Sequence, residues 1–260
     1  MSLLDPFGYG THEVLNQAPA MADYDAYSDD PALGKILSIF NAEWAAPHAS
    51  AVGKRVGSAR VQELARQANR NLPELRTHDR WGRRVDQIEF HPAWHELMTL
   101  AMRDEFHSLC WTKPKPGAQV ARAAVSFLWN QGENGICCPL GMTYSAIPIL
   151  RRDPARWAEF GKLVMSTDYD GRPIPAAQKR GGTVGMAMTE KQGGSDLRQT
   201  QTTATKNSDG TFARWAQVVL LRAALGCVPD ACKNGRGRIL FCRRGLAARR
   251  LPQSATNPAA

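Results

Sequence analysis

The sequence predicts a mainly α-helical domain followed by the beginning of a β-domain. Up to about residue 165, apolar residues recur every three or four positions, which is the spacing of one helix face. After Gln178 the chain changes to short segments rich in Gly and Thr, and a Ser-Asp-Gly turn signal follows at 208–210. We therefore place a domain boundary near Arg180.

The first expected helix runs from Pro31 to Phe40. Asp29 or Asp30 can accept hydrogen bonds from its first turn, and proline suits the first helical position because no partner is needed there for its missing N–H. Its apolar residues are Leu33, Ile36, Leu37 and Phe40. Residues 1–30 are polar and carry Pro, Gly, Asp and Tyr, so we expect an irregular N-terminal arm.

Five further helices are expected from the same spacing. One runs roughly from Ala51 to Asn69 and another from Pro92 to Leu109. An alanine-rich helix follows at about Gly117–Asn130, and two more cover parts of 138–151 and 153–165. Beyond them, threonines at 200, 202, 203 and 205 stand at near-alternate positions, which is typical of an exposed strand.

The most informative candidate site is 185–196, which reads Gly-Met-Ala-Met-Thr-Glu-Lys-Gln-Gly-Gly-Ser-Asp. The adjacent Gly193 and Gly194 allow a tight turn and a close approach of the backbone to a ligand. The hydroxyls of Thr189 and Ser195 can donate to a phosphate or a ring oxygen, and backbone N–H groups in such a turn can form an anion-binding nest. The alternative is an ordinary glycine-rich connector between domains.

The order M-T-E-x-x-x-G-S-D in this segment resembles the flavin-binding segment of the acyl-CoA dehydrogenase family. From about Thr11 to Phe212, the chain is similar to one branch of that family, the AidB-like flavoproteins of the bacterial alkylation response. The other motifs that occur in the family's order are N-L-P-E-L at 71–75, D-R-W-G-R-R-V-D at 79–86, F-H-P-A-W-H at 90–95, V-A-R-A-A at 120–124, C-P at 138–139, M-T-Y-S-A at 142–146 and Q-K-R-G at 178–181.

The resemblance implies FAD as cofactor, an acyl-CoA dehydrogenase fold, acyl-CoA or a related small molecule as substrate, a homotetramer, and DNA as a partner of intact members. Thr189 would bond the flavin ring near N5 or O4, Met188 would pack near the ring, and Ser195 with the neighbouring glycines would contact the pyrophosphate. The full set of cofactor-binding candidates implied is Met186, Ala187, Met188, Thr189, Glu190, Lys191, Gln192, Gly193, Gly194 and Ser195.

No catalytic residue is assigned. The family's catalytic carboxylate comes from a C-terminal helical domain, which we expect to be absent from this sequence together with much of the FAD adenosine site and the tetramer contacts. We therefore expect weak or no flavin binding by this chain, and poor solubility.

The net charge of +9 suggests a nucleic-acid partner, but the distribution of the charge along the chain argues against one. Residues 213–260 carry nine Lys or Arg and one acid, so this tail contributes +8 and the body is nearly neutral. No apolar run is long enough to span a bilayer, no secretory signal is visible at the start, and the six cysteines lack a C-x-x-C pair. A cytoplasmic protein with reduced thiols is expected.

The basic tail departs from the family pattern L-V-G-H-K-W-F-F-S-A-P, which would follow the expected strand turn. Here 213–224 reads A-R-W-A-Q-V-V-L-L-R-A-A, and codons for these residues, read one nucleotide later, permit the family pattern. We therefore expect a slip of one nucleotide in the coding sequence near Phe212 or Ala213, which the nucleotide sequence decides. The alternative is a genuine basic tail that binds nucleic acid.

Other tempting sites have simpler interpretations. His91 and His95 could share a helix face as metal ligands, but a structural role is favoured and no metal site is expected. Cys137 and Cys138 are expected to be buried thiols. Isolated cations at Lys113, Lys115, Lys179 and Arg180 are expected to be solvated. Trp81 with Arg80, Arg83 and Arg84 could be a nucleic-acid patch, although a charged loop between helices is favoured.

The expected organisation has four parts: an irregular arm at 1–30, the α-helical domain at 31–180, the start of a β-barrel-like middle domain with the FAD motif at 181–212, and an aberrant, disordered basic tail at 213–260. The favoured function is an FAD-dependent, acyl-CoA dehydrogenase-like oxidoreductase of the AidB-like branch, in incomplete form. The alternatives are a DNA-binding protective protein of the alkylation response with a structural flavin, and a purely structural helical domain.

Overall fold

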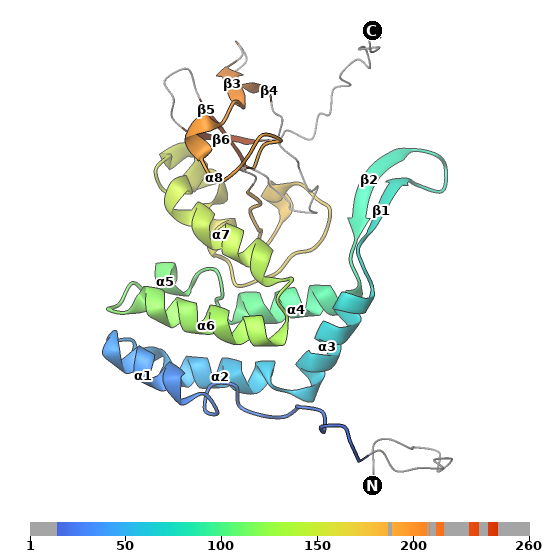
Figure 1. Ribbon diagram of the computed structural model, residues 1–260. Helices are drawn as coiled ribbons and strands as arrows, with labels where there is room; N and C mark the ends of the chain where they lie inside the picture. The colour runs from blue at the N-terminus through green and yellow to red at the C-terminus, as the bar shows by residue number, and fades with distance from the viewer. Residues whose placement is uncertain are drawn as a thin grey trace.

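The computed structural model describes residues 15–186, 189–206, 208, 212–215, 229–233 and 239–243. The chain is mainly helical, as expected, and a small sheet follows the helices (Figure 1). The α-helices are α1 (Pro31–Ile39), α2 (Ala46–Val56), α3 (Ala59–Arg70), α4 (Pro92–Arg103), α5 (Leu109–Thr112), α6 (Ala118–Gly132), α7 (Cys137–Leu150) and α8 (Pro154–Met165). The strands are β1 (Glu74–His78), β2 (Arg84–Glu89), β3 (Thr203–Lys206), β4 (Phe212–Trp215), β5 (Pro229–Lys233) and β6 (Ile239–Arg243).

The first helix confirms the capping prediction. Pro31 is the first residue of α1, and an Asp30 carboxylate oxygen accepts a hydrogen bond from the backbone N–H of Ala32 at 3.0 Å. Leu33 and Leu37 are buried, whereas Ile36 and Phe40 are exposed. The buried face of α1 is therefore narrower than the apolar stripe in the sequence.

The single helix predicted at 51–69 is wrong: two helices, α2 and α3, occupy this stretch and meet at Gly57–Ser58. Ser58 is extended, and its hydroxyl accepts from the Val61 N–H at 3.3 Å, so it begins a new helix. Tyr24 of the N-terminal arm packs so closely that a Cβ on Gly57 would lie 2.0 Å from the Tyr24 carbonyl oxygen. Apolar spacing alone did not reveal this break.

The helix predicted at 92–109 also ends early. α4 stops at Arg103, and a separate short helix, α5, begins at Leu109. Between them Glu105 has a φ of +54°, which an α-helix cannot contain. The turn directs Phe106 and His107 into the interior, where both are almost fully buried.

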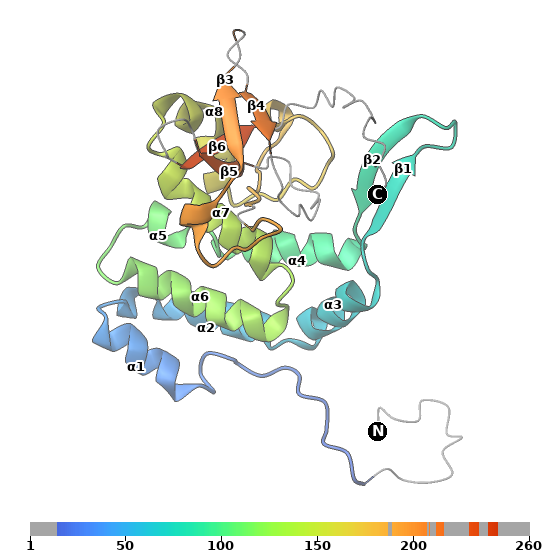
Figure 2. The same cartoon turned by 45° about the horizontal axis from the view of Figure 1, so that its top comes forward.

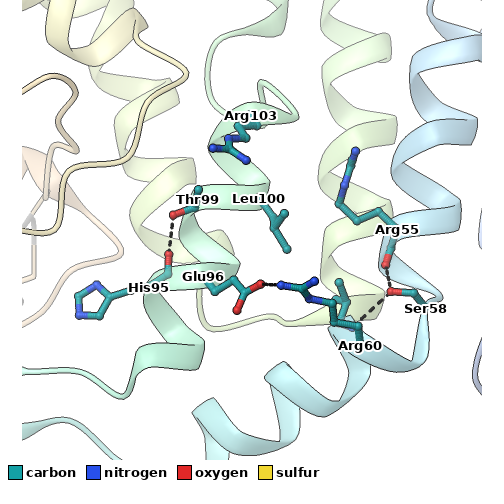
Figure 3. Close-up of a pocket in the computed structure, with 9 residues that line it drawn as sticks. Arg55, Ser58, Arg60, His95, Glu96, Thr99, Leu100 and Arg103 are labelled. Carbon is teal, nitrogen blue, oxygen red and sulfur yellow. Dashed lines mark hydrogen bonds and ion pairs between the residues drawn. The ribbon is translucent and has the colours of Figure 1, made fainter.

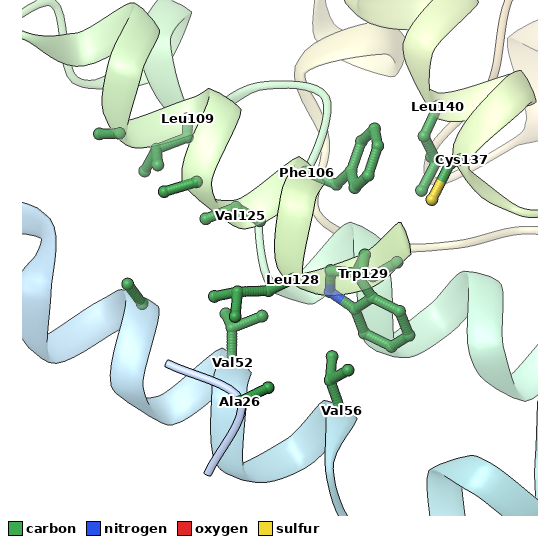
Figure 4. Close-up of a cluster of buried hydrophobic side chains, with 14 of the residues drawn as sticks. Ala26, Val52, Val56, Phe106, Leu109, Val125, Leu128, Trp129, Cys137 and Leu140 are labelled. Atoms are coloured by element: carbon green, nitrogen blue, oxygen red, sulfur yellow. The ribbon is translucent and has the colours of Figure 1, made fainter. Parts of the chain in front are cut away.

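The main core lies among α1, α2, α4, α6 and the start of α7 (Figure 4). α2 packs against α6, and α3 packs against α4. Trp129 on α6 is fully buried near Val52 and Val56 of α2. Residues within 26–140 thus form one continuous hydrophobic core, and a second, smaller cluster of Ala146, Ile147, Val164 and Val184 packs α7 against α8 and residue 184.

The charged loop predicted around Trp81 is instead a β-hairpin, which projects away from the helices at the end of α3 (Figures 1 and 2). β1 and β2 pair antiparallel, with Leu75 opposite Ile88. An Asp79 carboxylate oxygen accepts from the N–H groups of Trp81 and Arg83, each at 2.9 Å, and closes the turn. The strands show little burial and no clear apolar alternation. Asp79 was therefore the better sequence signal for a hairpin.

The sheet beyond α7 and α8 has the strand order β4-β3-β5-β6. β3 and β4 pair antiparallel across the predicted turn, of which only Ser208 is described. β5 is parallel to β3 and antiparallel to β6. β5 and β6 belong to the segment 213–260, where we expected no regular structure; apart from them and the end of β4, this segment lies outside the described residues.

Candidate functional site

The predicted flavin segment forms a tight turn between the helical body and the sheet. The backbone N–H of Glu190 donates to the Gly193 carbonyl at 3.0 Å, and the Gly193 N–H donates back to the Glu190 carbonyl at 3.1 Å. The short 3-10 helix Leu197–Gln199 then leads towards β3. Lys191 and Gln192 are thus the central residues of the turn, Gly193 closes it and Gly194 follows it, so the turn lies just before the position that the adjacent glycines suggested.

The Glu190 carboxylate ties this turn to the residues before β3. It accepts from the backbone N–H groups of Gln201 at 2.9 Å and Thr202 at 2.7 Å, and from the Thr202 hydroxyl and the Gln192 amide. Burial raises the pKa of this carboxyl, but the hydrogen bonds outweigh burial and lower the pKa of Glu190 to about 2. Its oxygens are occupied by the protein, so Glu190 is an anchor of the turn.

Replacing Glu190 by Gln is expected to loosen the turn and lower the free energy of unfolding by about 1–3 kcal/mol. The amide NH2 group would face backbone donors where a carboxylate oxygen now accepts. Because the folded-state pKa lies below the ordinary value, this stabilisation is complete above about pH 4.5 and is lost as the pH falls towards 2. Amide hydrogen exchange at Gln201 and Thr202 measures the loosening.

The control for this variant is Glu74→Gln, which changes an exposed carboxylate on the hairpin. Equal protection of Gln201 and Thr202 in the Glu190 variant and the control would contradict an anchoring role.

Although Glu190 is buried, other polar groups of the 186–195 segment remain exposed. Thr189 and Ser195 are both exposed. Within the described part of the chain, no hydrogen bond takes up the backbone N–H of Gly194 or Ser195. A Cβ on Gly194 would lie 2.7 Å from the Thr189 hydroxyl oxygen, so only glycine fits beside this threonine. Two hydroxyls and free N–H groups on one turn suit an anionic, oxygen-rich ligand.

α7 supports the beginning of the segment. The Val184 N–H donates to the Thr143 hydroxyl at 3.0 Å, and the Met186 N–H donates to the Met142 sulfur at 3.2 Å. Thr143 is fully buried, and its hydroxyl donates to the Pro139 carbonyl at 2.8 Å. In the sequence, only the family-like M-T motif hinted at these contacts. The spacing of apolar residues along a helix does not show that α7 contacts residues 184–186.

The remaining predicted site residues fall into two groups. Met186 is half-buried, whereas Lys191, Gln192 and Gly193 are exposed. Ala187 and Met188 lie outside the described residues. The structure thus brings Thr189, Gly194 and Ser195 together on the turn, and it adds Thr202 and α7 as supports that sequence reasoning missed.

A buried aspartate holds the connector that leads into the segment. Hydrogen bonds from the Arg172 guanidinium, at 2.8 and 2.6 Å, keep the pKa of Asp170 well below its usual range. The Arg180 N–H also donates to this carboxylate, and the Lys179 ammonium donates to the Asp170 carbonyl at 3.1 Å. The Lys179 ammonium therefore helps to fold the connector, which corrects the expectation of a solvated charge, whereas Arg180 contributes only its backbone N–H and its side chain is exposed.

The weaker candidates have structural roles. His91 caps α4, because its Nδ1 accepts from the Ala93 N–H, and His95 bonds the Tyr169 hydroxyl at 2.8 Å. No cluster of three possible metal ligands occurs among the described residues. Cys137 is buried, and burial raises its pKa to about 12, but Cys138 is exposed, which corrects the expectation that both are buried.

Lys113 and Lys115 are likewise engaged with neighbouring side chains. Lys113 pairs with Glu105, and the Lys115 ammonium lies over the Trp44 ring, 5.1 Å from its centroid.

None of the helices described is long and apolar enough to cross a bilayer.

Comparisons with known proteins identify a matching family and sequence relatives. Residues 16–171 match the family of the adaptive response protein AidB N-terminal domain. The chain is 40% identical over 204 residues to AidB of Escherichia coli (strain K12), and the match covers 78% of this chain and 38% of that protein. It is 29% identical over 180 residues to acyl-CoA dehydrogenase family member 11 of Caenorhabditis elegans, covering 67% and 28%.

Solved structures confirm the fold. The apo form of Bd2924 superposes with a TM-score of 0.68 at 23% identity, over 84% of this chain and 44% of that one. Caenorhabditis elegans ACDH-11, in complex with C11-CoA, gives a TM-score of 0.66 at 22% identity, over 90% and 40%. The chain thus spans less than half the length of the relatives it matches.

Proposed function

The chain belongs to the acyl-CoA dehydrogenase-like AidB family, and from this premise we propose that its 186–195 segment is one wall of an FAD site. The support is the anchored turn, which exposes Thr189 and Ser195 beside backbone N–H groups that no described residue occupies. FAD, when bound, supplies two-electron redox chemistry that side chains lack. The function that follows is that of an FAD-dependent, acyl-CoA dehydrogenase-like oxidoreductase.

The residues of the turn have distinct tasks in this proposal. The Thr189 hydroxyl donates to the flavin ring, and Ser195 with the Gly194 and Ser195 N–H groups holds the pyrophosphate. Glu190 positions both ends of the turn without touching the cofactor. The free N–H groups and the missing Cβ of Gly194 fit a phosphate close to the backbone. No residue of the described chain is assigned as the base.

FAD is expected to bind this chain weakly, with loss of the flavin on gel filtration but saturable quenching of flavin fluorescence in a titration. Thr189→Val should weaken that binding about tenfold, because it removes one hydrogen bond to the ring and keeps the side-chain shape. Thr77→Val on the hairpin is the matched control and should leave the affinity unchanged.

One result would argue against this proposal. Quenching that is absent or unaffected by Thr189→Val would remove the segment from the flavin site. A purified protein that keeps stoichiometric FAD through gel filtration would support the flavin site and would contradict only the expectation of weak binding.

DNA binding with a structural flavin is the second proposal, and the family resemblance supports it. The hairpin tip is the described feature with suitable chemistry. Trp81 is 70% exposed, and the guanidinium carbons of Arg80 and Arg83 lie 5.1 and 5.7 Å from its ring centroid. An exposed aromatic ring beside cations can stack on a base and contact a phosphate. Assembly into a homotetramer is likewise proposed from the family.

A further inference from the structure

A cleft of about 630 Å³ lies between α4 and the junction of α2 with α3 (Figure 3). Three arginines line it: Arg55 at the end of α2, Arg60 at the start of α3, and Arg103 at the end of α4. None of its lining residues belongs to the 186–195 segment. This volume is in the range of cavities that hold small organic ligands.

The charges of these arginines are only partly balanced. Arg60 reaches across the cleft to pair with Glu96 of α4, as Figure 3 shows. Arg55 pairs with Asp104, a buried carboxylate that is not part of the lining. Arg103 is exposed and has no carboxylate partner in the part of the chain that the structure describes. Of the three guanidinium groups at the cleft, only that of Arg103 has no carboxylate partner among the described residues.

The start of α3 is already capped. Ser58 and Arg60 line the cleft, but the Ala59 N–H donates to an Asp23 carboxylate oxygen at 2.9 Å and the Val61 N–H donates to the Ser58 hydroxyl at 3.3 Å. The helix terminus therefore adds little to the positive potential of the cleft, which comes from the arginines of three elements.

Apolar side chains complete the wall. Val61 and Leu100 face the cleft from α3 and α4. His95 also belongs to the lining, but its ring points away from the cleft and bonds the Tyr169 hydroxyl (Figure 3). A ligand that complements this lining has an anionic group, which pairs with the guanidinium groups, and an organic part, which packs against the apolar wall. Guanidinium groups match phosphate with paired hydrogen bonds.

We propose that the cleft lined by Arg55, Arg60 and Arg103 binds a small organic phosphate. Arg103 and Arg60 hold the phosphate, and the organic part lies against Leu100. The inference concerns a site separate from the flavin segment and does not depend on the proposed redox function.

The test is a calorimetric titration of the full chain with ADP, with adenosine as the uncharged probe. ADP is expected to bind and adenosine is not. Arg103→Gln should weaken ADP binding about tenfold, the loss of one charged hydrogen-bond partner. Arg60→Gln should weaken it more, because Glu96 would then face the phosphate without a counter-ion. Arg152→Gln is the matched control, since Arg152 is an exposed arginine outside the cleft.

Specific outcomes would overturn the proposal. One is no ADP binding, and another is an equal loss in the Arg152→Gln control. ADP could also enter the flavin site through its own phosphates, so Thr189→Val is measured in parallel. ADP binding weakened by Thr189→Val and unchanged by Arg103→Gln would place the nucleotide at the flavin segment. Because Arg103 is exposed and unpaired among the described residues, its replacement should not disturb folding.

Discussion

Asp104→Ala is expected to lower the free energy of unfolding by about 3–5 kcal/mol, the usual cost of removing one partner from a buried charged network. Asp104 is 4% exposed. One carboxylate oxygen pairs with Arg55, and the other accepts from the Trp129 indole N–H at 3.0 Å. Without the carboxylate, the fully buried indole N–H has no acceptor and Arg55 has no counter-ion.

The carboxylate also connects three elements that pack the core. Asp104 follows α4, Arg55 is on α2 and Trp129 is on α6, while the Asp104 backbone carbonyl bonds His48 Nε2 at 3.0 Å. Burial raises the pKa of Asp104, an effect that Arg55 opposes. The ionised group is thus costly to bury and depends on both partners, which is why losing it should be more damaging than losing a surface pair.

Urea unfolding followed by far-ultraviolet circular dichroism measures this effect. Asp104→Asn keeps the shape and one acceptor, so a smaller loss is expected, and it provides a folded variant if Asp104→Ala does not fold. Asp29→Ala, at an exposed position, should change stability by no more than about 0.5 kcal/mol. A loss in Asp104→Ala as small as that of Asp29→Ala would show that the network does not stabilise the fold.

Acidification from pH 6.5 to 4 is expected to destabilise the protein by about 3 kcal/mol through His107 alone. His107 is fully buried, and burial lowers its pKa to about 4. Its Nε2 bonds the Ser166 carbonyl at 3.0 Å, which assigns the proton to this nitrogen. The buried Nδ1 has no hydrogen-bond partner among the described residues, so a second proton there would be unsatisfied.

The sign follows from the two states. Between pH 6.5 and 4 the unfolded chain protonates His107 but the folded chain does not, so stability is complete above pH 6.5 and falls as the pH decreases to 4. Two charged groups near the ring act in opposite directions, since Glu105 raises the pKa and Arg122 lowers it. Loss of the Glu190 and Asp170 contributions begins only below their ordinary carboxyl pKa values.

Urea midpoints at pH 7, 5.5 and 4.5 for the unmodified chain and for His107→Gln test this expectation. His107→Gln lacks the titrating group. Its free energy of unfolding should therefore fall less than that of the unmodified chain as the pH decreases from 6.5 to 4. His78→Gln on the exposed hairpin is the control and should follow the unmodified chain. A His107→Gln protein with the same pH dependence as the unmodified chain would rule out His107 as the cause.

The helices and the site segment were predictable to different degrees. α1, α6 and α8 stand where apolar spacing, and for α1 also its cap, placed them, because these signals depend on neighbours within one or two turns. The hairpin at 74–89 was missed because its strands are mostly exposed and carry no apolar alternation. The break at Gly57–Ser58 was missed because the helix was placed by apolar spacing alone, although Gly57 and the capping Ser58 are local signals of a helix end and a helix start.

The sequence by itself determined the helical class, the family and the position of the candidate flavin turn, since all three depend on the order of residues along the chain. Only the tertiary structure decided which polar groups are used within the protein and which remain available to a ligand. It showed that Glu190 is occupied by Thr202 and Gln201, that Asp104 joins α2 to α6, and that three arginines share one cleft. The physical reason is that burial and hydrogen-bond pairing arise between segments far apart in the chain, where spacing carries no signal.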